Sequence, residues 1–191
     1  MTKRALIVVD VQNDYFPGGK WPLDGIEAAA DNTARVIAVA RAAGDLVVHI
    51  RHEFRSANAP FFAPGSEGAH IHPKVLNHDG ETVILKHAAN AFRETTLKEA
   101  LDRNGVTEVV IVGNMSHMCV DATARAAKDF GYEVTVVHDA CATRDLEFNG
   151  VTVAAAEVHA AFMAALAFAY ATVVSTADHL SAEAASAVKR A

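Results

Sequence analysis

The sequence has few cysteines, few prolines and no run of positive charge. Its 191 residues include 2 Cys, 5 Pro and 11 Gly, and 17 Lys and Arg residues are outnumbered by 23 Asp and Glu residues. The low content of Gly and Pro excludes collagen-like and linker sequences. A disordered chain is also excluded, because 51% of the residues are hydrophobic and only 21% are charged. A net charge of −6 without clustered cations argues against nucleic acid or an anionic membrane as a partner. We therefore expect a small-molecule partner.

The two cysteines, Cys119 and Cys141, are too few for the disulfide framework of a secreted domain, and their spacing matches no Cys/His metal signature. The apolar run 5–9 is too short for the core of a signal peptide. These features indicate a reducing, cytoplasmic setting. The stretch 158–177 is long enough to span a bilayer, but it is rich in alanine and contains His, Ser and Thr, so it predicts a buried helix running into a strand.

Strand-like and helix-like segments alternate along the chain. The short β-branched run 5–9 is typical of a parallel strand buried on both faces, whereas apolar residues recur at helical spacing over 26–43. Further strands are expected at 46–50, 82–85, 108–112, 133–137 and 172–174, and further helices at 95–103, 118–130 and 151–170. No linker or repeat divides the chain. The sequence therefore predicts a single α/β domain over 1–191 with a six-stranded sheet.

One connection, 52–81, is much longer than the others and contains several Pro and Gly residues. Long loops inside compact domains are usually lids or binding loops. We therefore expect this segment to face the substrate.

Three chemically active residues follow predicted strands. Asp10 ends the first strand, Lys86 ends the third, and Cys119 lies between the fourth strand and the next helix. Ligands of open parallel sheets bind beyond the carboxyl ends of the strands, so these residues are expected to meet there. A helix N-terminus and a nearby Lys86 would lower the pKa of the thiol, and Asp10 could act as base. The alternative is a strand-end ion pair beside a buried cysteine.

The residues around these three positions form recognisable motifs. They read DVQNDYF over 10–16, Lys86 followed by NAF over 90–92, and GNMSHMCV over 113–120. Together they resemble the isochorismatase-like cysteine hydrolase superfamily, which includes nicotinamidases, N-carbamoylsarcosine amidohydrolase, streptothricin hydrolase and the isochorismatases. The resemblance covers nearly the whole chain and implies a three-layer α/β/α fold with a mainly parallel sheet.

The resemblance also assigns roles to individual residues. It implies that Asp10, Lys86 and Cys119 form a catalytic triad. It further implies a cis peptide bond between Asn114 and Met115, and an oxyanion hole formed by the backbone N–H groups of Met115 and Cys119.

The sequence departs from the nicotinamidases of this superfamily. Their metal-binding Asp-x-His pair after the second strand is replaced here by Arg51, His52 and Glu53. His70 and His72 could share one side of an extended segment, but a turn that metal-free members share explains them better. We therefore predict no metal and no cofactor.

The retained cysteine favours acyl transfer over the vinyl ether hydrolysis of isochorismatase. The expected reaction is cleavage of a C–N bond in an amide, ureide or lactam through a thioester. Alternatives are an isochorismatase-type vinyl ether hydrolase, a nicotinamidase and a non-catalytic binding protein on the same fold. A dinucleotide-binding enzyme is disfavoured because the glycine-rich turn after the first strand is missing.

Candidate pocket residues and the oligomeric state complete the predictions. The apolar helix 151–170 is expected either to pack inside the fold or to contact a second subunit, giving a homo-oligomer such as a dimer or tetramer.

Side chains near the strand ends could line the substrate pocket. They are Gln12, Phe16, Trp21, Phe92 and His117, with Phe61 and Phe62 as further aromatic candidates.

Overall fold

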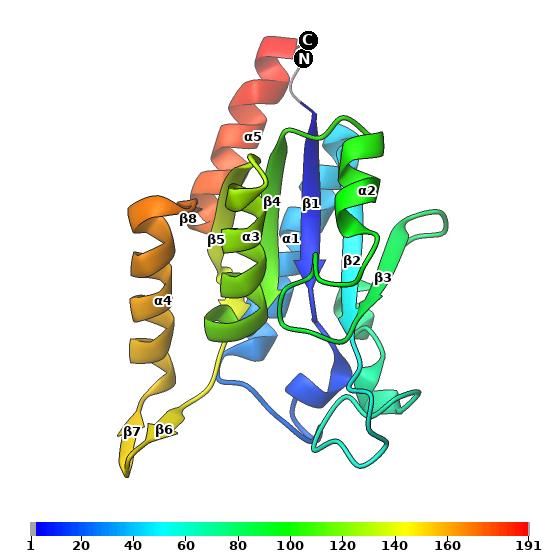
Figure 1. Ribbon diagram of the computed structural model, residues 1–191. Coiled ribbons are helices and arrows are strands. Elements are labelled where there is room, and N and C mark those ends of the chain that lie inside the picture. Colours follow the sequence, from blue (N-terminus) through cyan, green and yellow to red (C-terminus); the bar gives the residue numbers. More distant parts are fainter. Residues whose placement is uncertain (1–2, 191) are drawn as a thin grey trace.

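The computed structural model describes residues 3–190 and centres on a six-stranded sheet (Figure 1). The strand order is β3-β2-β1-β4-β5-β8, and every neighbouring pair is parallel. The strands are β1 (Arg4–Val9), β2 (Leu46–His52), β3 (Thr82–Lys86), β4 (Glu108–Asn114), β5 (Glu133–Ala142) and β8 (Thr172–Val174). The predicted parallel sheet is confirmed.

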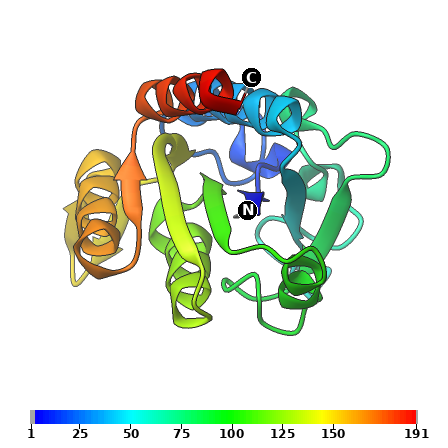
Figure 2. The same cartoon turned by 90° about the horizontal axis from the view of Figure 1, so that it is seen from above.

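Helices cover both faces of the sheet and give three layers. Figure 2 shows α1 (Ile26–Ala43) and α5 (Thr176–Arg190) side by side on one face, with α2 (Leu97–Arg103) and α3 (Asp121–Asp129) on the other. The remaining helix, α4 (Ala155–Ala169), contacts α3 and β8 at the edge of the sheet. The predicted three-layer α/β/α architecture is confirmed. Within residues 3–190, no helix is both long and apolar enough to cross a bilayer.

The core explains why the central strands are apolar without interruption. In β1, Ala5, Ile7 and Val9 pack into the cluster beneath α2 and α3, whereas Leu6 and Val8 pack into the cluster beneath α1. Successive side chains of a strand point to opposite faces, so a strand covered on both sides must be apolar throughout.

Four local elements differ from the sequence-based expectations. Residues 151–153, predicted as helix, instead form β7 (Val151–Val153), which pairs antiparallel with β6 (Leu146–Phe148). The reason is the Asn149-Gly150 turn, whose positive φ angles of 51° and 75° suit a two-residue hairpin. The helix predicted over 118–130 begins as a π-helical turn, Ser116–Val120. Helix α5 was not predicted, and α4 is only partly buried.

The long connection between β2 and β3 is folded against the sheet edge. Asp14 anchors it, because its Oδ2 accepts from the Phe62 N–H at 2.6 Å and its Oδ1 accepts from the Lys20 N–H at 3.1 Å. Gly68 packs so closely that an added Cβ would lie 2.1 Å from Asp14 Oδ1. In Figure 1 this loop and the β6–β7 hairpin gather at the end of the sheet toward which β1 points. The loop therefore borders the carboxyl ends of the strands.

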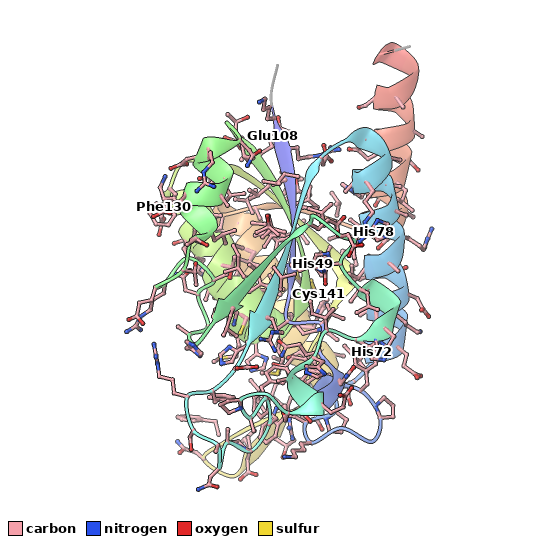
Figure 3. All side chains as sticks on the ribbon, turned by 90° about the vertical axis from the view of Figure 1, so that its right-hand side faces the viewer. His49, His72, His78, Glu108, Phe130 and Cys141 are labelled. Carbon is pink, nitrogen blue, oxygen red and sulfur yellow. The ribbon has the colours of Figure 1, made fainter. Side chains whose placement is uncertain are left out.

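A second polar network ties the far end of this loop to α1. The Glu81 carboxylate accepts from Arg41 Nε and Nη2, both at 2.8 Å, and from the His78 N–H at 2.8 Å. His49 Nε2 lies 3.3 Å from the same carboxylate. Figure 3 shows His49 and His78 on the side of the sheet that α1 covers. The hydrogen bonds from Arg41 lower the pKa of Glu81 to about 2.

We expect Glu81→Gln to lower the free energy of unfolding at pH 7 by roughly 1.5 to 3 kcal/mol, the range for hydrogen bonds to charged groups. Because the folded pKa is depressed from 4.5 to about 2, this stability is present above about pH 4.5 and is lost as the pH falls toward 2. Urea unfolding at pH 7 and pH 3 should show the gap between wild type and variant shrinking. Glu133→Gln, at an exposed position, is the matched control, and a gap of equal size at both pH values would contradict the prediction.

Candidate active site

The three residues that follow the predicted strands meet at one point. Lys86 Nζ lies 2.8 Å from Asp10 Oδ2 and 3.2 Å from Cys119 Sγ. Asp10, Lys86 and Cys119 are 0%, 1% and 6% exposed. A carboxylate, an ammonium and a thiol from distant parts of the chain therefore share one buried site.

Strand register brings these residues to the same edge. Val9 is opposite Gly113, and His52 is opposite Lys86, so β1, β2, β3 and β4 end close together. Gly113 has φ +113°, and an added Cβ would lie 2.0 Å from Val9 O. Only glycine allows β4 to come this close to β1 immediately before Asp10.

The backbone of Asp10 is held from both sides. Its φ is +49°, in the left-handed region that aspartate tolerates better than most residues. Its N–H donates to Ile50 O at 3.0 Å, and Asn114 Nδ2 donates to its carbonyl at 3.4 Å. Asn114 Oδ1 in turn accepts from the Ala142 N–H at 3.0 Å. The side chain of Asn114 therefore fixes Asp10 relative to β5.

The Lys86 ammonium lies among four electron-rich groups. Besides Asp10 and Cys119, it contacts His52 Nδ1 at 2.8 Å and Ala88 O at 2.9 Å. Burial alone would lower the pKa of Lys86, but attraction to Asp10 and Cys119 outweighs burial, and the pKa is raised. Lys86 is therefore a fixed positive charge.

The thiol of Cys119 is protonated in the resting site. Burial and the Asp10 carboxylate raise its pKa to about 12, against the opposing influence of Lys86. The expectation of a lowered thiol pKa is wrong, because burial raises the pKa of the thiol and the Asp10 carboxylate raises it further, so that Lys86 does not bring it down. The buried Cys141 also has a pKa raised to about 12 through burial. What sets Cys119 apart is its contact with Lys86.

The turn that carries Cys119 follows directly from β4. The Asn114–Met115 peptide bond is cis. In the π-helical turn Ser116–Val120, the N–H groups of Met118 and Val120 both donate to Met115 O, at 3.0 and 3.2 Å. This turn carries Cys119 from the end of β4 into α3.

The five candidate pocket residues occupy different surroundings. The Gln12 carboxamide is engaged with backbone: Nε2 donates to His52 O and Ala69 O, and Oε1 accepts from the His52 N–H, all at 2.8 Å. Gln12 therefore fastens the end of β2 to the long loop. Phe16 stacks on His72 with ring centroids 3.5 Å apart, and Trp21 stacks on Phe61 at 4.7 Å.

The other two candidates lie nearer to the thiol. Phe92 belongs to the same buried cluster as Cys119 and packs against Phe130. His117 lies in the turn of Cys119, and its Nδ1 contacts Thr143 Oγ1 at 2.5 Å. Phe61 and Phe62 pack on Tyr15 with ring centroids 5.8 and 4.6 Å away.

Two residues at the site, His52 and Tyr15, are not predicted from the sequence. In the sequence His52 stands out only as a departure from a metal motif, yet His52 Nδ1 contacts the Lys86 ammonium. Tyr15 is buried, and its pKa is raised chiefly by burial and further by its electrostatic interactions with Cys119 and Asp10. Its place in the 10–16 motif was the available signal for Tyr15, whereas the contact of His52 depends on the register of β2 against β3.

Among residues 3–190, one side-chain group has the donors and spacing to hold a metal ion. Asp10, His52 and Cys119 offer ligand atoms that lie within 4.8 Å of one another. The Lys86 ammonium contacts all three of these residues. A metal bound there would have to displace a buried cation, so the donor set fits an ammonium better than a metal.

A cavity of about 300 Å³ lies beside the residues that directly follow Lys86. Its lining comes from the loops after β2 and β3 and consists of Arg55, His87, Ala88, Arg93 and Glu94. Ala88 links this cavity to Lys86, because the Ala88 carbonyl accepts a hydrogen bond from the Lys86 ammonium.

Known proteins share both the sequence and the fold. Residues 4–178 match the family described as Isochorismatase domain. The chain is 48% identical over 172 residues to the uncharacterized isochorismatase family protein YddQ of Bacillus subtilis, covering 90% of this chain and 96% of YddQ. It is 39% identical over 146 residues to a streptothricin hydrolase of Streptomyces noursei, covering 75% of this chain and 51% of that protein.

A solved structure gives the same result. The crystal structure of an isochorismatase-type hydrolase from Oleispira antarctica has a TM-score of 0.91 and 56% sequence identity, covering 94% of this chain and 97% of that one. The resemblance seen in the sequence motifs is thereby confirmed. The chain belongs to the isochorismatase domain family of hydrolases.

Proposed function

We propose that this protein is a cysteine hydrolase that cleaves a C–N bond of a small amide, ureide or lactam through a thioester. The observation that carries the proposal is the Cys119 thiol in contact with a Lys86 ammonium that is itself paired with Asp10. A buried nucleophile beside an acid–base group and a fixed charge is the arrangement that acyl transfer requires. Relatives support the choice of bond, since they include a maleamate amidohydrolase and an N-carbamoylsarcosine amidase.

Acylation begins with the neutral thiol. As Sγ of Cys119 attacks the carbonyl carbon, the thiol proton passes to the Asp10 carboxylate. The backbone N–H groups of Met115 and Cys119 are proposed to hold the carbonyl oxygen as it becomes negative. Asp10 then gives its proton to the leaving nitrogen, the C–N bond breaks, and a thioester remains on Cys119.

Deacylation uses the same groups in reverse order. Asp10 accepts a proton from water, and the resulting hydroxide attacks the thioester carbonyl. The C–S bond breaks, the carboxylic acid leaves, and Cys119 recovers a proton from Asp10. Lys86 keeps its proton throughout and stabilises the negative charge that passes between Sγ and the Asp10 carboxylate.

The substrate is proposed to enter through the cavity beside Ala88. The cavity's volume of about 300 Å³ suits a small molecule. Its lining comes from loops, which are the usual location of specificity residues on a rigid scaffold.

The test is a screen of primary amides, ureides and lactams, with product formation followed by mass spectrometry and Cys119→Ala as the blank. Turnover that disappears in the blank supports the proposal. Hydrolysis of a vinyl ether that persists in Cys119→Ala, with no turnover of any C–N compound, would replace it with the isochorismatase-type reaction.

Asp10→Asn should nearly abolish acylation. The variant keeps the shape of the side chain but removes the group that accepts and returns the proton. Positioned proton transfer contributes about 10² to 10⁴-fold, and we expect kcat/KM to fall by at least that much. Asp14→Asn serves as comparison, since Asp14 anchors the loop instead. Full activity of Asp10→Asn would assign the proton transfer to another group.

Lys86→Met should slow the alkylation of Cys119. Lys86 opposes the influences that raise the thiol pKa, so its loss should raise that pKa further and reduce the thiolate fraction at pH 8. Iodoacetamide labelling followed by peptide mapping measures this, and Cys141 in the same protein is the internal reference. Unchanged labelling of Cys119 in the variant would show that Lys86 does not act on the thiol.

Catalysis is predicted to be independent of metal, because the Lys86 ammonium contacts each residue of the candidate ligand group. EDTA should leave kcat/KM unchanged. Activity that is lost on chelation and restored by Zn²⁺, Fe²⁺ or Mn²⁺ would overturn this prediction.

We further propose that the protein is a homo-oligomer, a dimer or a tetramer. Helix α4 is apolar over most of its surface, and its Phe168 is 91% exposed. Light scattering coupled to size exclusion should give a multiple of the 20.2 kDa chain mass. Phe168→Asp should reduce that mass, whereas Asp129→Lys, at an exposed position on α3, should not. A monomeric wild type would contradict the proposal.

A reducing, cytoplasmic location remains part of the proposal. Cys119 and Cys141 are both free and buried. The proposed reaction needs the Cys119 thiol in its reduced form, which the cytosol maintains.

A further inference from the structure

The contact between His52 and Lys86 determines which ring nitrogen of His52 carries the hydrogen. Its Nδ1 lies 2.8 Å from Lys86 Nζ, and Lys86 is a protonated ammonium with no lone pair to offer. Nδ1 must therefore accept the hydrogen bond. Burial, and then the Lys86 charge, lower the pKa of His52 to about 4, so the ring is neutral at pH 7. A neutral ring that accepts at Nδ1 carries its hydrogen on Nε2.

The His52 ring is held firmly in this orientation. The Gln12 side chain forms hydrogen bonds with both backbone groups of His52: it accepts from the N–H and donates to the carbonyl. The rings of Phe54 and Phe62 flank the imidazole at centroid distances of 4.8 and 6.1 Å. Gln12 therefore acts on the site through His52.

His52 also decides where the Lys86 ammonium points. An ammonium has three N–H donors, but four groups surround this one. His52 Nδ1 and Ala88 O, at 2.8 and 2.9 Å, can engage two of them. The third is then directed at the pair formed by Asp10 and Cys119. Without His52, one N–H would be free to turn away from the reacting groups.

The arrangement is hard to explain by stability alone. His52 is 7% exposed, and its Nε2 is buried without a hydrogen-bond partner among the described residues. A buried donor without an acceptor destabilises a fold. A leucine or phenylalanine at this position would fill the space between Phe54 and Phe62 without that penalty.

We propose that His52 is a positioning residue of the site, which orients the Lys86 ammonium through Nδ1 as the Nε2–H tautomer. The proposed function gives this contact its purpose, because the third ammonium donor must face Asp10 and Cys119 during proton transfer. The contact itself is testable without a substrate.

The first measurement uses the wild-type protein. With histidine labelled by ¹⁵N, the shifts of His52, assigned by comparison with His52→Asn, show which ring nitrogen carries hydrogen at pH 7. The expected result is a bare Nδ1 and a protonated Nε2. Hydrogen on Nδ1, or on both nitrogens, would overturn the inference whether or not any variant folds.

The second measurement compares variants. His52→Asn can place its Oδ1 near the position of Nδ1 and keep an acceptor for Lys86, whereas His52→Gln reaches toward Nε2 and His52→Leu offers no acceptor. With lysine labelled by ¹³C at Cε, we expect the pKa of Lys86 to fall by at least about one unit in the Leu variant. One such unit corresponds to 1.36 kcal/mol. The Asn variant should stay near wild type.

Activity on the compound found in the screen should follow the same order. His52→Leu and His52→Gln should lower kcat at least tenfold, while His52→Asn should recover most of it, and KM should change less than kcat. His70→Leu, at an exposed histidine, is the matched control and should keep full activity. Equal kcat in the Asn and Leu variants, or an unchanged Lys86 pKa in the Leu variant, would overturn the inference. If the labelling results hold but no C–N compound is hydrolysed, the proposed function fails and His52 still positions Lys86.

Discussion

The buried ion pair between Asp10 and Lys86 is the interaction on which the site depends. Removing both charges from water is costly, and a pair at 2.8 Å survives inside a protein only when further polar contacts compensate. Here His52 Nδ1 and Ala88 O provide them on the ammonium side. Three features bring these groups to one edge of the sheet. They are the strand register, the close approach of β4 to β1 at Gly113, and the hydrogen bond between Gln12 and the backbone of His52. Much of the geometry of this edge thus follows from accommodating one pair of charges.

Burial and the same pair together explain why Cys119, the proposed nucleophile, is a thiol in this site. A lone lysine beside Cys119 would favour the thiolate, but burial raises the thiol pKa to about 12, and the Asp10 carboxylate acts in the same direction as burial. In the proposed mechanism, the proton stays on sulfur until a substrate carbonyl is in place, and Asp10 then accepts it. This arrangement protects a reactive side chain from adventitious alkylation and oxidation, which act on the thiolate.

Much of the fold was predictable because periodicity and strand ends are local features. The bounds of α1 came directly from its apolar spacing and Gly44, and all six strands of the main sheet were found. Asp10, Lys86 and Cys119 could be selected because parallel strands must end at one edge. The β6–β7 hairpin was missed because Val151 and Val153 fit either a helix or a strand until the Asn149-Gly150 turn is considered. The contact of His52 with Lys86 and the protonation of Cys119 depend on distances and burial, which no spacing along the chain encodes.

The most direct test of covalent catalysis by Cys119 is detection of the acylated protein. The protein would be mixed with its most rapidly hydrolysed amide or ureide, quenched in acid within the first turnover, digested and mapped by mass spectrometry. We expect the mass of the acyl group on the peptide that contains Cys119, none on the peptide that contains Cys141, and no adduct in Asp10→Asn. Hydrolysis that proceeds at the wild-type rate in Cys119→Ala, with no acylated peptide at any time, would contradict this expectation.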